Sequence, residues 1–180
     1  MDNRRLSFKQ RAGPHLAALL LALALARPGA AEKLRAAIFG FEFEDTSLQG
    51  ETGGTRSDEQ ARLHWLDMQL RDMLASSGEY EPVDTAPVEI QARARKLRSC
   101  DGCETALAQK LGAQVAVIGW VQKVSNLILN INMVVREVAS GKVVAAGSAD
   151  IRSNSDASWL KGLDWLLSHR IAQQLAMRRP

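Results

Sequence analysis

The chain has few of the residues on which metal and thiol chemistry depend. Its 180 residues include two cysteines, Cys100 and Cys103, and three histidines. Beyond residue 31, His64 and His169 each stand alone, without the H-x-x-H or H-E-x-x-H spacing that places two ligands on one helix face. The histidines therefore predict no metal site, and no bound cofactor is expected.

Motifs for nucleophilic catalysis or phosphate binding are also missing. There is no G-x-S-x-G, no P-loop and no G-x-G-x-x-G, and the glycines of 50–54 are followed by Thr55-Arg-Ser57 without the P-loop lysine. Glu42, Glu44 and Asp45 are close in sequence, but carboxylates of this kind are usually solvated. We therefore expect no catalytic residues, and the missing motifs favour a non-enzymatic protein over an enzyme.

No apolar run reaches the roughly 20 residues that a membrane-spanning helix needs. Four basic residues within the first 11 precede an uncharged run from His15 to Ala26, and small residues follow up to Ala31. This pattern predicts a secretory signal peptide at 1–31, cleaved near Ala31. Because no cysteine lies near that point, attachment of a lipid is not expected. The rest, 32–180, is predicted to be a single domain in the periplasm, without stable membrane insertion.

An excess of positive charge is missing once the predicted signal peptide is set aside. The whole chain has a formal net charge of +3, but residues 1–31 hold five of its basic residues and one acidic residue. The remaining 18 basic and 19 acidic residues nearly balance. The composition thus gives no reason to expect binding to nucleic acid.

What is present is a clear alternation of strand and helix patterns. Strands are predicted at 33–44, 80–83, 114–124, 127–138 and 143–151. Helices are predicted at 57–77, 87–97 and 100–111, with a last one that begins at Ser155 or Asp156. The order β-α-β-α-β-β-β-α implies an α/β domain of two or three layers, with a mixed sheet of about five strands that ends in an antiparallel meander.

The first strand and the segment after it carry two further expectations. Phe39, Phe41 and Phe43 alternate along the strand, which predicts that their rings share one face and that Glu42 and Glu44 lie on the other. The glycine-rich segment 45–56 is expected to be a loop.

Several strings resemble a bacterial family of small secreted proteins whose function is unknown. The resemblance covers nearly all of 32–180 and rests on Asp45-Thr-Ser47, Cys100-Asp-Gly-Cys103, the segment 111–130 and the segment 152–159. A more distant similarity, to the amino-terminal domain of TolB and to CsgG-like periplasmic modules, rests on Leu111-Gly-Ala113, Gly119 and Gly141-Lys142. It implies an envelope interaction module without catalytic residues. The TolB propeller has no counterpart here, so TolB function is not implied.

The cysteine pair allows three interpretations. A helix N-terminus and the neighbouring Arg98 would favour a thiolate, as in a redox protein. However, the preceding segment 91–98 is basic and helix-like, and no proline lies in a strand after the pair, which argues against a thioredoxin context. In an oxidising compartment we expect a Cys100–Cys103 disulfide that fixes the start of a helix. The redox and metal alternatives stay open.

A candidate binding surface combines an aromatic residue, a cation and amides near the predicted hairpin at Ser125-Asn126, together with the loop before the last helix. Its residues are Trp120, Gln122, Lys123, Ser125, Asn126, Asn130, Asn132, Arg152, Asn154 and Trp159. The alternative is that the asparagines bond across the hairpin and that the loop only caps the helix. The predicted partner is an unknown envelope protein or a small polar ligand, in an accessory role for envelope transport or oxidation. The alternative function is a periplasmic thiol-disulfide redox protein.

Overall fold

The computed structural model describes residues 32–177, so the predicted signal peptide lies outside the described residues. A five-stranded mixed sheet forms the centre of the domain, in the order β2-β1-β3-β4-β5. Its strands are β1 (Leu34–Asp45), β2 (Tyr80–Pro82), β3 (Val115–Ser125), β4 (Ile128–Glu137) and β5 (Val143–Ile151). β1 runs parallel to β2 and β3, and β3, β4 and β5 pair antiparallel. The predicted α/β class and the closing meander are confirmed.

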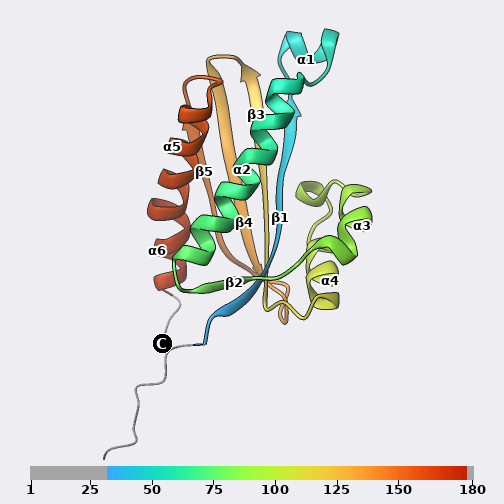
Figure 1. The fold of residues 1–180 in the computed structure, drawn as a ribbon, viewed down its shortest axis with the longest axis vertical. Helices are drawn as coiled ribbons and strands as arrows, with labels where there is room; N and C mark the ends of the chain where they lie inside the picture. The colour runs from blue at the N-terminus through green and yellow to red at the C-terminus, as the bar shows by residue number, and fades with distance from the viewer. Residues whose placement is uncertain (1–31, 178–180) are drawn as a thin grey trace, which may run out of the picture. The chain divides into compact units, whose positions relative to one another are not determined.

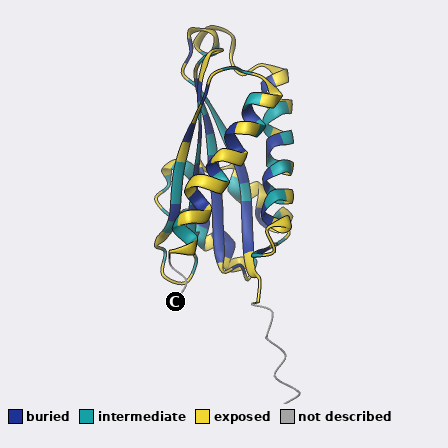
Figure 2. Cartoon of the chain, turned by 90° about the vertical axis from the view of Figure 1, so that its left-hand side faces the viewer, coloured by how far each residue is buried: buried dark blue, intermediate teal, exposed yellow. Residues whose placement is uncertain are grey.

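Helices cover both faces of this sheet. They are α1 (Leu48–Gly53), α2 (Ser57–Ser76), α3 (Glu89–Arg93), α4 (Cys103–Lys110), α5 (Asp156–Leu166) and α6 (Ala172–Ala176), with a π-helical turn at Leu167–Ile171 and 3₁₀ turns at Ala86–Val88 and Leu97–Ser99. The long helices α2 and α5 lie on one side of the sheet, and α3 and α4 lie beyond β1 (Figures 1 and 2). The two connections that flank β2 thus cross opposite faces of the sheet.

Strand alternation explains the two cores. Val117 and Val121 of β3 pack with the leucines of α2 and α5 in the larger core, whereas Ala116 and Ile118 point to the other face. On that face Ala108 of α4 meets Ala37 and Ala116, so small side chains let the helix approach the sheet closely.

A bulge in β1 changes the predicted face of one phenylalanine. The register with β3 shifts between Ile38 and Phe41, and Gly40 within it has φ +80°. Phe39 therefore packs against the α4 side, whereas Phe41 and Phe43 join the α2 side. The prediction of one shared face for all three rings is wrong, because an extra residue in a bulge reverses the alternation that follows.

Two predicted segments differ from the structure. The expected loop at 45–56 contains α1, which Ser47 caps by accepting a hydrogen bond from the Gly50 N–H. The expected helix at 87–97 is broken, since α3 ends at Arg93. The chain then turns so that the buried Leu97 can donate its N–H to Oε1 of Glu42 on β1. This tertiary bond overrides the local helical pattern.

Candidate functional site

The predicted binding surface is divided between the two faces of the sheet. Trp120 and Gln122 lie on the face opposite α2, as do Asn130 and Asn132, which are paired with them in register. Lys123 points to the α2 side and is fully buried. Lys123 therefore cannot belong to a surface with Trp120, because successive residues of a strand point to opposite faces.

Trp159 is also not at the surface. It is fully buried in the main core, where its ring stacks on Phe43 with centroids 5.9 Å apart and the Arg62 guanidinium lies 5.4 Å from the ring centroid. Trp159 therefore belongs to the apolar face of α5, with Leu163 and Leu166, and not to a binding surface.

Asn130 is occupied by β5. Its Nδ2 donates to Oδ1 of Asp150 over 2.7 Å, and its Oδ1 accepts from the Ser148 hydroxyl over 2.7 Å. The alternative of bonding across strands therefore holds for Asn130, with β5 as the partner strand.

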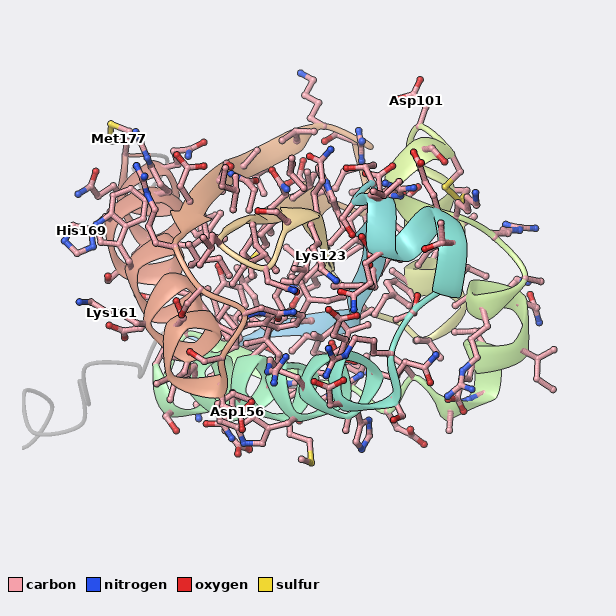
Figure 3. All side chains as sticks on the ribbon, turned by 90° about the horizontal axis from the view of Figure 1, so that it is seen from above. Asp101, Lys123, Asp156, Lys161, His169 and Met177 are labelled. Carbon is pink, nitrogen blue, oxygen red and sulfur yellow. A yellow bond between two sulfur atoms is a disulfide. The ribbon has the colours of Figure 1, made fainter. Side chains whose placement is uncertain are left out.

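Lys123 is the centre of a buried ionic cluster at the carboxyl ends of β1 and β3. Its Nζ lies 2.6 Å from Oε1 of Glu59 and 3.0 Å from Oδ2 of Asp45, and it donates to Oε1 of Gln49 over 3.1 Å. In the view from above, Lys123 lies in the interior, whereas Lys161 and Asp101 lie at the periphery (Figure 3). Three acceptors thus match the three protons of the ammonium group.

The pKa values of this cluster keep its charges in place. Burial lowers the pKa of Lys123, but the bonds to Glu59 and Asp45 outweigh it and raise the pKa above its ordinary value. For Asp45, burial raises the pKa, but hydrogen bonds from Ser47 and the Lys123 ammonium lower it below its ordinary value. Lys123 and Asp45 therefore both carry their charges near neutral pH.

Asn126 and Asn154, two further members of the predicted surface, extend this cluster. Asn154 donates from Nδ2 to Oε1 of Glu59 over 2.6 Å and from its backbone N–H to the Asn126 carbonyl over 3.0 Å. Arg62 bonds to Oδ1 of Asn154 over 3.0 Å and to Asp156 over 2.6 Å. These contacts join the β3–β4 hairpin, the start of α5 and α2. Of the predicted residues at this end, Arg152 is exposed and Ser125 half-buried.

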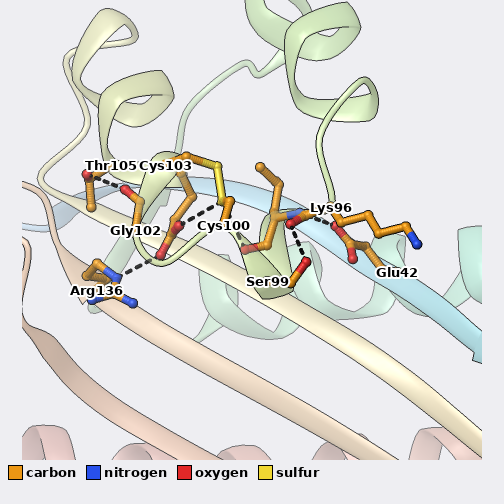
Figure 4. The surroundings of a disulfide bond; sticks show 10 residues. Glu42, Lys96, Ser99, Cys100, Gly102, Cys103, Thr105 and Arg136 are labelled. Atoms are coloured by element: carbon orange, nitrogen blue, oxygen red, sulfur yellow. Dashed lines mark hydrogen bonds and ion pairs between the residues drawn. A yellow bond between two sulfur atoms is a disulfide. The ribbon is translucent and has the colours of Figure 1, made fainter.

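Cys100 and Cys103 form a disulfide whose second residue begins α4, as predicted (Figure 4). The adjacent Glu104 is buried and accepts from Nε of Arg136 over 2.7 Å. Ligand atoms of Cys100, Cys103 and Glu104 lie within 4.8 Å of one another. As a disulfide the two sulfurs provide no thiolate, so this group does not offer a metal the ligands it needs.

A groove along the outer edge of β1 was not predicted. It has a volume of about 680 Å³ and lies between α2 and the segment 85–98. β2 pairs with β1 only over Leu34–Ala36, so no described strand covers β1 beyond that point. Pro82 at the end of β2 and the basic residues of 93–98 were the available signals in the sequence.

Side chains of α2 replace part of the missing strand. Oδ1 of Asp67 accepts from the Phe41 N–H over 2.7 Å, and Arg71 donates to the Ile38 carbonyl. Burial raises the pKa of Asp67 to about 6, against the bond from Phe41 and the charges of Arg71 and His64, which lower it. At one end of the groove, the Asp67 carboxylate therefore accepts the hydrogen bond that a neighbouring strand would otherwise accept from the Phe41 N–H.

The opposite wall of the groove is basic. Arg98 pairs with Glu42 and Glu44 of β1. Arg95 and Lys96 are exposed, and their side chains have no carboxylate partner among residues 32–177. The α2 wall of the groove combines the apolar Leu63 and Met68 with polar side chains that include Asp67 and Arg71, and the other wall is mainly cationic.

Comparisons with known proteins give a family and a set of similar folds. The sequence model of the family described as "Protein of unknown function (DUF2380)" matches residues 34–171. No curated protein sequence matches the chain. Within the described part of the chain, no helix is both long enough and apolar enough to cross a bilayer.

Three solved structures illustrate the similarity in fold. The C-terminal domain of LpoB from Salmonella enterica is 15% identical with a TM-score of 0.48, over 75% of this chain and 94% of that one. Lipoprotein GNA1162 from Neisseria meningitidis is 18% identical with a TM-score of 0.43, over 82% and 99%. The PelC dodecamer from Paraburkholderia phytofirmans is 13% identical with a TM-score of 0.42, over 76% and 87%.

Proposed function

The chain belongs to the DUF2380 family of unknown function, and we propose that it is a non-catalytic interaction module of the bacterial periplasm that binds a partner protein along β1. The observation that carries this proposal is the open edge of β1 beside the groove. A strand edge that keeps unpaired backbone groups is a template for another chain, and peptide recognition by strand addition uses such edges.

The ionic cluster has the contacts of a structural element and not those of a catalytic site. Lys123 is a buried cation beside two carboxylates, an arrangement that often marks an active site. Here its ammonium protons are directed at Glu59, Asp45 and Gln49, and Glu59 is also held by Asn154. These polar groups serve to join strand ends, helices and loops.

The periplasmic setting rests on two features. The sequence of 1–31 predicts a signal peptide, and the disulfide between Cys100 and Cys103 suits an oxidising compartment.

Site-specific photo-cross-linking in cells tests the proposal. A photoreactive residue is placed at Met68, which is 45% exposed beside the groove, or at the exposed Lys161 of α5 as the matched control. We expect a covalent adduct with a periplasmic protein from position 68 and none from position 161. Equal adducts from both positions, or none from position 68, would contradict the role of the groove.

A further inference from the structure

We propose that the groove along β1 binds an extended segment of a partner chain in which apolar and acidic residues alternate, and that this segment adds to β1 as a further strand. This inference rests on the proposed function and specifies the chemistry of the partner. Three features support the proposal: the backbone of β1, the side chains on the two walls of the groove, and the charge of Arg95 and Lys96.

The backbone of β1 beyond the bulge presents hydrogen-bonding groups to the groove. The N–H of Thr46 donates to the Lys123 carbonyl over 2.9 Å. The backbone N–H and C=O groups of even-numbered residues at this end of β1 therefore point toward β3. The N–H of Phe41 points the other way, to Asp67. Because the direction alternates along a strand, the N–H and C=O of Phe43 face the groove. Among residues 32–177, no side chain or backbone group bonds to them from that side.

The two walls then determine which side chains fit. A strand added to β1 would direct alternate side chains to opposite faces of the sheet. Those on one face would meet α2, where Leu63 and Met68 contribute apolar surface. Those on the other would meet Arg95 and Lys96, beside Glu42, whose carboxylate is already paired with Arg98. Apolar residues on the first face and acidic residues on the second therefore suit the two walls.

The unpaired cations favour an acidic segment of another protein over the other occupants. Arg93 and Arg98 already pair with carboxylates of this chain, but Arg95 and Lys96 do not among the described residues. A second copy placed edge to edge would bring its own basic wall to the same face, and like charges there would repel. The C-terminal residues Arg178-Arg-Pro180 are themselves basic.

The probe for this proposal is a synthetic octapeptide of alternating Val and Glu, and its binding to residues 32–180 is measured by fluorescence anisotropy. The test variant carries Arg95→Glu with Lys96→Glu, and the control is Lys161→Glu on α5. Because all three side chains are exposed, the fold should persist, which circular dichroism checks. We expect the Kd of the test variant to rise about tenfold or more and that of the control to stay unchanged. A peptide of alternating Val and Lys should bind the test variant better than the original protein.

Hydrogen exchange by NMR locates the bound peptide. The Phe43 amide should become protected when the Val-Glu peptide binds, and N-methylation of alternate peptide amides should remove that protection. Unchanged affinity in the test variant, or protection only at another edge, would overturn the proposal. Concentration-dependent dimerisation with protection of Phe43 in the absence of peptide would identify a second copy as the occupant and also overturn it. If no peptide binds but the cross-link at position 68 persists, the proposal of an acidic partner segment is wrong and the proposed function stands.

Discussion

Lys123 illustrates, at the scale of a single residue, how a charge can be held inside a fold by its neighbours. Removing the ammonium leaves Asp45 and Glu59 buried without a counter-charge, which is more harmful than removing the whole pair. Lys123→Met should therefore reduce the free energy of unfolding by ~3–5 kcal/mol, and adding Glu59→Gln should restore part of the loss. Urea denaturation measures both, with Lys161→Met as the control. Strictly additive losses would show that Lys123 and Glu59 are not coupled.

Asp67 should make stability depend on pH. Its pKa is about 6 in the folded protein against 3.8 as the ordinary value, so the folded state holds the proton more tightly. The resulting stabilisation is complete below about pH 4 and is lost as the pH rises through about 6. Asp67→Asn keeps an acceptor for Phe41 but cannot ionise. Its free energy of unfolding near neutral pH should therefore be ~1–2 kcal/mol higher than that of the original protein.

The pH series for Asp67→Asn has a matched control. Asp164→Asn on the exposed side of α5 should leave the profile unchanged. A less stable Asp67→Asn protein at neutral pH would mean that attraction to Arg71 and His64 outweighs the burial of the carboxylate.

At the scale of the elements, the bulge in β1 determines which side chains of this strand face α2. Gly40 has φ +80°, and a Cβ there would lie 2.6 Å from Oδ1 of Asp67. Gly40→Ala should therefore cost ~1–3 kcal/mol of unfolding free energy, through the positive φ and the displaced carboxylate. Gly53→Ala in α1, where a Cβ meets nothing within 4 Å, is the control and should be neutral or slightly stabilising. Equal effects of the two substitutions, measured by thermal unfolding, would contradict this account.

The disulfide should act as a clamp at the start of α4. Replacing both Cys100 and Cys103 by serine should lower stability by only ~1–2 kcal/mol, because a four-residue loop has little entropy to lose. Thermal unfolding with and without reductant measures this effect. A reversible reduction potential between about −120 and −270 mV, the range of dedicated oxidoreductases, would instead favour the redox alternative.

Elements whose pattern is local were predictable. The strands β3, β4 and β5 and the start of α5 at the Ser155 cap follow from apolar periodicity, a short turn and a capping residue. The face of Phe39 and the break after α3 were not, because each depends on a contact from elsewhere: Asp67 beside Gly40, and Glu42 at the Leu97 N–H. A period read along the sequence contains no information about such long-range bonds.

At the scale of the whole molecule, the candidate site was the least predictable part. The predicted surface was selected as an aromatic residue, a cation and amides near the hairpin, together with the loop before α5, and the fold placed Lys123 and Trp159 inside. The β1 groove depends on how far β2 extends and on where two helical segments pass, so only the assembled chain defines it.

The signal peptide is a prediction about the whole chain and can be tested directly. Expressed with all 180 residues in a bacterium, the protein should be recovered from the periplasmic fraction with an N-terminus near residue 32. Edman sequencing or intact mass measures the cleavage. An uncleaved protein that remains with the cytoplasmic fraction would contradict the prediction and the proposed location.

The short β2 has a consequence for solubility as well as for recognition. An edge that can accept a partner strand can also accept any extended segment exposed by a neighbouring unfolded chain, which is how ordered aggregates begin. Asp67 and Arg71 bond to the β1 backbone at Phe41 and Ile38, so they leave only the part of the edge beyond Phe41 open to another strand. By shortening the open edge in this way, the two side chains lower the tendency of the folded protein to aggregate.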